Sequence, residues 1–232
     1  MDENEIGFGR VLSKSFEIWK RDALLIFAVG AVVYVPMQVV IEIASRHLAP
    51  NTSNPNQIYD AIRHLFAPLA SLGILRLAYS RCRNSDEPFD FPGLLMLGVS
   101  RWGRHFWAGF LAGLRILLYL LLLIVPGLIK AVKFSFIDCR IATTDDSASE
   151  ARENSERLTG DRWWLVLRFL LMLWLLEFIF EVALLVPFGA LLKMTVPGIF
   201  LGAAVKLAET YFIVCKGVFY FELESRPAAP AA

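Results

Sequence analysis

The chain has 232 residues, of which 56% are hydrophobic, with a mean hydropathy of +0.54 and a formal net charge of +1. A soluble domain has an apolar content of roughly 45–50%, so this composition excludes a water-soluble domain and indicates an integral membrane protein. Most Lys and Arg residues lie between the apolar runs and form no continuous basic face, which argues against a nucleic-acid-binding protein.

The first segment, residues 1–22, is predicted to form an amphipathic helix in the plane of the membrane surface. Large apolar side chains recur at near-helical spacing, and basic side chains take the opposite face. The apolar set is Ile6, Val11, Leu12, Phe16 and Trp19, and the basic set is Arg10, Lys14 and Lys20. The segment lacks a short apolar core followed by small residues, so we expect no cleaved signal peptide here.

Six apolar segments follow and predict a single all-α transmembrane domain, residues 23–224. A helix rises about 1.5 Å per residue, so roughly 20 residues cross a hydrocarbon layer of about 30 Å. The predicted spans cover residues 23–44, 64–80, 106–125, 128–141, 163–187 and 196–221. The fourth is short, which leaves a thinned bilayer or a re-entrant hairpin open. Residues 225–232 are predicted to be a disordered tail.

Basic residues are divided unequally between the two sides of these spans. Four precede the first span, five arginines separate the second from the third, and four separate the fourth from the fifth. The opposite loops carry only Arg46, Arg63 and Lys193. The positive-inside rule therefore predicts cytoplasmic termini and an arrangement of the spans as three hairpins.

A polar segment with Trp and Arg at its end precedes each predicted hairpin. The boundary triplets are Trp19-Lys20-Arg21, Trp102-Gly103-Arg104 and Asp161-Arg162-Trp163. The last of these segments begins with Ser147 and Glu150 at the spacing of a capping box and ends at Gly160. This pattern suggests a triplicated unit of interfacial helix and hairpin. The alternative is the general preference of membrane proteins for Trp and Arg at the boundaries.

Two stretches, IVPGLIKAVKFSFIDC and ASEARENSERLTGDRWWLV, resemble the membrane region of bacterial glycerophosphoryl diester phosphodiesterases and related six-helix membrane proteins. The shared order is a Pro-Gly turn, a short apolar helix, a polar helix and an aromatic span. The leading segment VLSKSFEIWKRDALLIF also resembles the start of that region. The resemblance implies a multi-pass protein of the bacterial inner membrane. It does not imply the phosphodiesterase activity, which belongs to a separate soluble barrel of about 250 residues.

The common signatures of a catalytic centre are absent from the sequence. It contains no GxSxG elbow, no phosphate-binding P-loop and no HExxH helix. The three histidines lack ligand spacing, and the three cysteines form no CxxC pair. The sequence therefore predicts no enzyme activity, no cofactor and no metal site.

Charged residues inside the predicted spans are the candidate functional residues. A charge at a helix centre costs about 2.5–3.5 kcal/mol unless it is paired or hydrated. Counting about 1.5 Å per residue places these charges in one layer, roughly 15–21 Å from the cytoplasmic boundary. They are Arg115, Lys130, Lys133, Glu177, Glu181, Lys206 and Glu209. We expect Glu177 to pair with Lys206 or Arg115. The layer is expected to be a set of structural ion pairs, with a polar ligand cavity as the second interpretation and an intramembrane catalytic site using Glu177 and Glu181 as the third.

The Trp and Arg residues at the boundaries are expected to contact lipid headgroups. They are Trp19, Arg21, Arg101, Trp102, Arg104, Arg162 and Trp163.

Together these features favour a non-catalytic inner-membrane protein, either a lipid-associated module in envelope homeostasis or a scaffold for a membrane or cytoplasmic partner protein. The expected partners are membrane lipids, and no nucleic acid is expected. The alternative is a small-solute or lipid transporter that uses the charged layer, because transporter sites lie at mid-membrane between repeats.

Overall fold

The structure is a computed structural model and describes residues 6–47, 55–85, 87–192 and 195–226. These residues form helices and turns without a strand, so the predicted all-α class is confirmed. In chain order the elements are α1 Phe8–Arg21, α2 Ala23–His47, α3 Pro55–Cys82, α4 Phe91–Leu122, α5 Ile124–Lys133, α6 Ile137–Thr143, α7 Ala148–Thr159, η2 Gly160–Arg162, α8 Trp163–Leu192 and α9 Thr195–Ser225. The predicted loop residue Lys193 and most of the predicted disordered tail lie outside the described residues.

Local sequence signals explain where two of the helices begin. Asp90 precedes α4, and its side chain accepts a hydrogen bond from the Gly93 N–H, with Pro92 in the first turn. Ser147 and Glu150 form the predicted capping box at the start of α7, each side chain accepting from the other residue's backbone N–H.

Two predicted boundaries differ from the structure. Residues 91–105 are not a separate interfacial helix, because α4 runs unbroken from Phe91 to Leu122 and no proline interrupts the sequence between the two expected pieces. The predicted fourth span is not one helix, because a turn separates α5 from α6 after Lys133. At 10 residues, α5 is about 15 Å long and covers half of a bilayer core.

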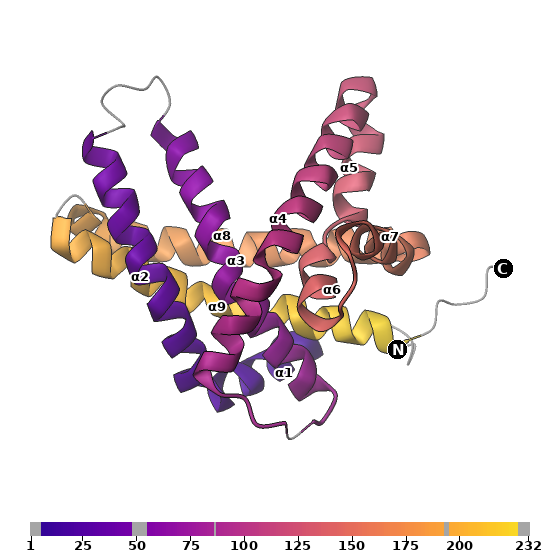
Figure 1. Ribbon diagram of the computed structural model, residues 1–232, viewed down its shortest axis with the longest axis horizontal. Coiled ribbons are helices and arrows are strands. Elements are labelled where there is room, and N and C mark those ends of the chain that lie inside the picture. The colour runs from indigo at the N-terminus through magenta and orange to yellow at the C-terminus, as the bar shows by residue number, and fades with distance from the viewer. Residues whose placement is uncertain (1–5, 48–54, 86, 193–194, 227–232) are drawn as a thin grey trace.

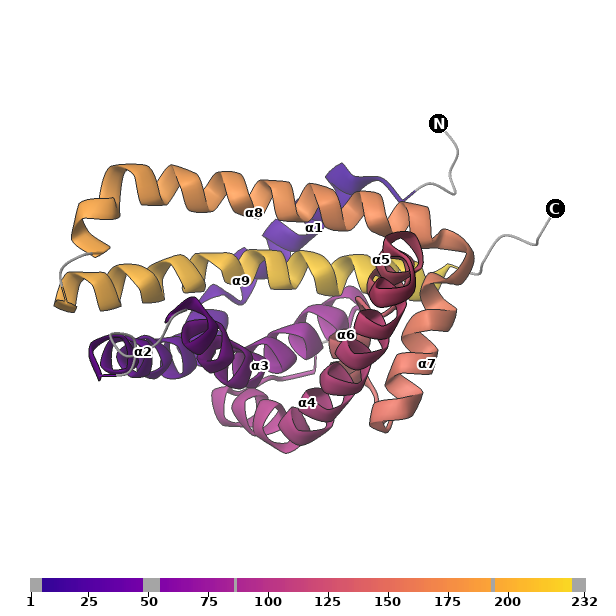
Figure 2. The ribbon, with the colours of Figure 1, turned by 90° about the horizontal axis from the view of Figure 1, so that it is seen from above.

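The three predicted helix pairs are present but are not parallel to one another. Figure 1 shows α2 with α3 and α4 with α5 as two steep pairs, while α8 and α9 run across them. Seen from above, α8 and α9 lie side by side along the long axis (Figure 2). Among the described residues, two helices, Ala23–His47 and Asn56–Cys82, are identified as long and apolar enough to cross a membrane. Membrane association is therefore weakly supported, and six crossings go beyond this finding.

Helix α9 lies at the centre of the fold and packs against α1, α2, α3 and α8. Its buried face includes Val214, Val218 and Phe219. The Phe219 ring stacks on that of Phe169 in α8, with the ring centroids 3.7 Å apart. A helix that is apolar on several faces can be buried in this way, whereas a helix with a single apolar stripe lies at a surface.

Helices α3 and α4 cross with their backbones in contact. A Cβ atom on Gly98 would lie 2.0 Å from the Leu69 carbonyl oxygen, and one on Gly73 would lie 2.7 Å from the Leu94 carbonyl oxygen. Only glycine permits so close an approach. The crossing holds α3 in place between α4 and α9.

Large apolar side chains remain exposed along α4 and α8, and we refer to them as the outer apolar surface. Each leaves about half or more of its area uncovered. On α4 they are Trp107, Phe110, Leu114, Leu117, Leu118 and Leu121, and on α8 they are Trp164, Leu171, Trp174, Leu175, Phe178 and Ile179.

Candidate ligand cavity

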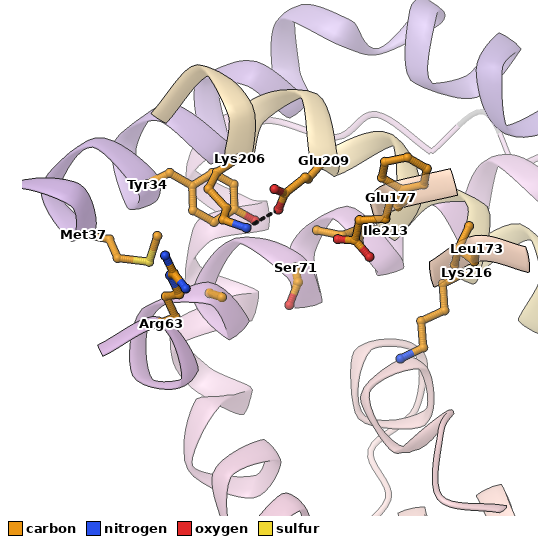
Figure 3. A pocket seen from close by; sticks show the side chains of 12 residues that line it. Tyr34, Met37, Arg63, Ser71, Leu173, Glu177, Lys206, Glu209, Ile213 and Lys216 are labelled. Atoms are coloured by element: carbon orange, nitrogen blue, oxygen red, sulfur yellow. Dashed lines mark hydrogen bonds and ion pairs between the residues drawn. The ribbon is translucent and has the colours of Figure 1, made fainter. Parts of the chain in front are cut away.

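A cavity of about 290 Å³ lies among α2, α3, α8 and α9. Figure 3 shows charged, polar and apolar side chains around it. The lining residues are Tyr34, Met37, Arg63, Ala67, Ser71, Leu173, Glu177, Lys206, Glu209, Phe212, Ile213 and Lys216. Two helices near the start of the chain, α2 and α3, and the last two, α8 and α9, therefore build it together.

Each helix contributes residues three or four positions apart, which is the spacing of one helix face. On α9, Lys206, Glu209, Ile213 and Lys216 follow this spacing, and on α8 Leu173 and Glu177 do the same. Similar pairs and triplets come from α2 and α3. The cavity is thus lined by whole helix stripes and not by loop residues.

Two carboxylates contact one lysine beside this cavity, and a third carboxylate lines the cavity from α8. The Lys206 ammonium donates a hydrogen bond to Glu209 Oε2, and its Nζ atom lies 3.9 Å from Glu181 Oε1. Glu177 lines the same cavity from α8. Glu209 is 8% exposed, and its other oxygen, Oε1, is buried with no hydrogen-bond partner. We refer to Glu177, Glu181, Lys206 and Glu209 as the acidic cluster.

Two further cations line the cavity, and each already has a carboxylate of its own. Arg63 donates to Asp60 at 3.3 Å, and the Lys216 ammonium lies 2.6 Å from Asp138 Oδ2. In Figure 3, Arg63 and Lys216 lie at opposite ends of the view, with Ser71 and Glu177 between them. These two cations therefore do little to neutralise the acidic cluster.

The structure pairs the predicted charges differently from our expectation. Lys206 binds Glu209, three residues away on α9, and not Glu177, because a neighbour on the same helix face is reached without any change in helix packing. Arg115 is exposed on α4, a helix that contributes no residue to the cavity lining. The predicted Arg115–Glu177 pair is therefore absent from the described residues.

Lys130 and Lys133 belong to a second charge cluster, which lies beside α7. Their ammonium groups lie 2.5 Å and 3.3 Å from Glu156 Oε1. Burial raises the pKa of the Glu156 carboxyl, but the hydrogen bond and charge of Lys130 outweigh this and hold the pKa below its usual value. The single predicted layer is thus divided between two separate clusters.

The boundary arginines bind protein carbonyl groups. Arg101 donates to the carbonyl oxygens of Ile141 and Thr144 at 2.7 Å and 2.9 Å, in the last turn and at the C-cap of α6. Arg162 donates to the carbonyl oxygen of Leu223 at 3.0 Å near the end of α9. The last four carbonyl groups of a helix lack intrahelical partners, and a guanidinium satisfies two of them at once.

Other predicted headgroup residues also have partners within the fold. Arg104 donates to the Asp146 carbonyl oxygen at 3.2 Å. The Trp19 indole N–H donates to Thr210 Oγ1 at 3.0 Å, and that of Trp102 donates to a carbonyl oxygen on α3 at 2.8 Å. Arg21 is exposed at the end of α1, and Trp163 is half-buried against Trp164. These contacts give most of the boundary residues a structural role that the sequence analysis did not foresee.

Several residues that line the cavity were not predicted from the sequence. Lys216 was not singled out, although it lies seven residues after Glu209 and on the same helix face. Arg63 was counted as a loop cation, and Ser71 was not considered because a serine within an apolar helix is common. Among the described residues, no group of three His, Cys, Asp or Glu side chains is placed to hold a metal ion.

Comparison with protein-family models matches residues 93–221 to a domain of unknown function (DUF7847). No curated protein and no solved structure matches the chain. The matched segment runs from the start of α4 nearly to the end of α9, so it contains the acidic cluster and the α8–α9 side of the cavity.

Proposed function

The chain belongs to the DUF7847 family, and from this premise and its geometry we propose that it is a non-catalytic integral membrane protein that acts as a lipid-associated module. One observation carries the proposal: the outer apolar surface on α4 and α8. Monomeric soluble proteins rarely expose contiguous apolar patches of more than a few hundred Å², so this surface requires lipid around it.

Several finer statements belong to the same proposal. The protein crosses the bacterial inner membrane six times with both termini in the cytoplasm, as the distribution of basic residues favours. It is related to the membrane region of glycerophosphoryl diester phosphodiesterases, and it works in envelope homeostasis or as a scaffold for a partner protein. The predicted third hairpin consists of α8 and α9. Because these two helices run across the other pairs (Figure 1), their crossing of the membrane is the part of this topology that most needs a test.

Membrane fractionation and topology reporters test the proposal together. The protein is expected to stay in the membrane pellet after alkaline carbonate and to leave it only with detergent. A reporter that is active only outside the cytoplasm is expected to work after residue 50 or 193, and to fail after residue 84, 145 or 226. If the reporter is active after residue 50 but inactive after residue 193, the chain crosses the membrane fewer than six times. Release by carbonate would overturn the membrane assignment itself.

A lipid or small-solute transporter is the second candidate, favoured by the cavity among α2, α3, α8 and α9. Proteoliposomes with a fluorescent phosphatidylethanolamine in both leaflets distinguish it from a static module. A transporter makes the inner-leaflet probe accessible to an external quencher, whereas a static module leaves it protected, as in protein-free liposomes.

A further inference from the structure

We propose that the cavity binds the primary ammonium group of an amine-bearing amphiphile, with Glu209 and Glu177 accepting hydrogen bonds from it. The inference rests on the proposed lipid-associated function and adds the chemical class of the ligand. Three observations lead to it: an unpartnered buried oxygen, the charge of the acidic cluster, and the size and lining of the cavity.

The first observation is Glu209 Oε1, which is buried and has no hydrogen-bond partner, on a residue that is 8% exposed. Buried polar atoms in folded proteins nearly always have a partner, so an exception needs an explanation. A carboxylate oxygen can only accept a hydrogen bond, and the missing partner is therefore a donor. In Figure 3 the Glu209 carboxylate lies beside the cavity, near Lys206 and Tyr34.

The second observation is the charge of the acidic cluster. Glu177, Glu181 and Glu209 carry three negative charges when ionised, against one positive charge on Lys206. Arg63 pairs with Asp60 and Lys216 pairs with Asp138, so these two cations do not balance the excess negative charge of the acidic cluster. A cluster of unequal charge that includes the buried Glu209 favours a bound cation, and an ammonium supplies both the positive charge and the donor that Glu209 lacks.

The third observation is the cavity, whose volume of about 290 Å³ is far larger than a bare ion needs. Met37, Leu173 and Ile213 offer apolar walls for a carbon chain. The rings of Tyr34 and Phe212 also line it, and aromatic rings attract organic cations. A primary amine fits better than a quaternary one, because a quaternary ammonium has no N–H to donate.

Arg63 favours a zwitterion over a simple amine. Its side chain is exposed at one end of the cavity and donates to Asp60 at 3.3 Å, and a guanidinium has five N–H groups. A phosphate beside Arg63 and an ammonium beside Glu209 describe a phosphoethanolamine group. Two sources carry this chemistry: a membrane phospholipid, and a soluble phosphoethanolamine.

Native mass spectrometry of the protein released from nanodiscs tests the inference. The nanodiscs contain equal amounts of phosphatidylethanolamine and phosphatidylcholine with identical acyl chains, so the two lipids differ only in N-methylation. The parent is expected to retain the ethanolamine lipid about tenfold more than the choline lipid, as a charged hydrogen bond supplies. Glu209→Gln and Glu177→Gln are expected to bring this ratio close to one. Glu153→Gln, an exposed glutamate on α7, is the matched control and should leave it unchanged.

The ratio measured for the parent protein tests the inference even if a variant fails to fold. Equal retention of the two lipids by a parent that also fails to bind soluble phosphoethanolamine, or an unchanged ratio in a folded Glu209→Gln variant, would overturn the inference. Soluble phosphoethanolamine that binds the parent in choline-lipid nanodiscs, and not Glu209→Gln, would support the ammonium site and identify the soluble source. A protein that stays in the membrane after carbonate but prefers neither the ethanolamine lipid nor soluble phosphoethanolamine would refute this inference alone, whereas carbonate release would refute the proposed function.

Discussion

The charged side chains around α6 form more complete hydrogen bonds than those beside the cavity. Around α6, Arg140 donates to Asp146 Oδ2 from Nε at 3.0 Å and from Nη2 at 2.8 Å, and to Glu224 at 2.9 Å. Arg101 satisfies two carbonyl groups nearby. Beside the cavity, by contrast, Glu181 and Glu209 share Lys206, and one oxygen of Glu209 has no hydrogen-bond partner.

This difference separates structural charges from candidate ligand-binding charges. A buried polar group with complete hydrogen bonding stabilises the fold, whereas one without a partner destabilises it. Removing a charged side chain should therefore lower the free energy of unfolding strongly in the first region and change it little in the second. Four predictions test this contrast.

The largest expected effect is at a third site, where a paired charge like those around α6 is more deeply buried: Arg81 binds both oxygens of Asp22 at 3.0 Å and so joins the α1–α2 junction to the end of α3. Each of the two side chains is 10% exposed. Arg81→Ala should lower the free energy of unfolding by about 3 kcal/mol, because it leaves a buried carboxylate unpaired. Unfolding in detergent, measured for Arg81→Ala, Asp22→Asn and the double variant, should show strong coupling. Additive losses would contradict the pairing.

The second prediction concerns Arg101 and the carbonyl groups of Ile141 and Thr144. Arg101→Lys should lower the free energy of unfolding by about 2 kcal/mol, because the guanidinium contacts both carbonyl oxygens from Nη1 and Asp145 from Nη2, and a single ammonium cannot reproduce this planar fork. Arg83→Lys, at an exposed position after α3, is the control and should change it little. Equal unfolding temperatures for Arg101→Lys and the parent would show that positive charge alone suffices.

The third prediction tests the capping box of α7. Ser147→Ala should cost about 1 kcal/mol of stability at neutral pH. The Ser147 backbone N–H lowers the pKa of the Glu150 carboxyl, so the contribution of Glu150 is present above its unfolded pKa and is lost as the pH falls through the lower, folded value. The unfolding temperatures of the parent and Glu150→Ala should therefore differ at pH 7 and converge below about pH 4. A difference that persists in acid would indicate packing and not ionisation.

The smallest effect is expected at Glu177 in the cavity. Glu177→Gln should change the free energy of unfolding by less than about 0.5 kcal/mol or raise it, because the substitution removes one negative charge from a cluster that has too many. Thermal unfolding in detergent without added lipid measures this. A loss comparable to that of Arg81→Ala would show that Glu177 is structural and would remove the contrast between the two regions.

Much of the helical framework was predictable because its signals are local. The apolar runs mark the long helices, and Asp90, Ser147 and Glu150 mark helix starts through contacts within a few residues. The exceptions have local causes too. Nothing between residues 91 and 122 breaks a helix, so α4 absorbs the expected interfacial segment, whereas the turn after Lys133 was not marked by a proline or glycine.

The candidate site was predictable only in part. Glu177, Glu181, Lys206 and Glu209 stand out because charge inside an apolar helix is costly. The depth of a residue along its helix does not show which other helix packs against it. The estimate from depth therefore wrongly placed Lys130 beside these residues.

By itself, the sequence determined the all-α class, the apolar character of the helices and the identity of the unusual charges, because these depend on composition and on spacing along one helix. Only the tertiary structure decided which charges meet. The crossing of α9 over α2 and α3 brings Arg63 and Ser71 to the acidic cluster, and the fold of α6 and α7 gives Arg101 and Arg140 their partners. Such contacts join residues far apart in the chain, and they follow from how helices pack against one another.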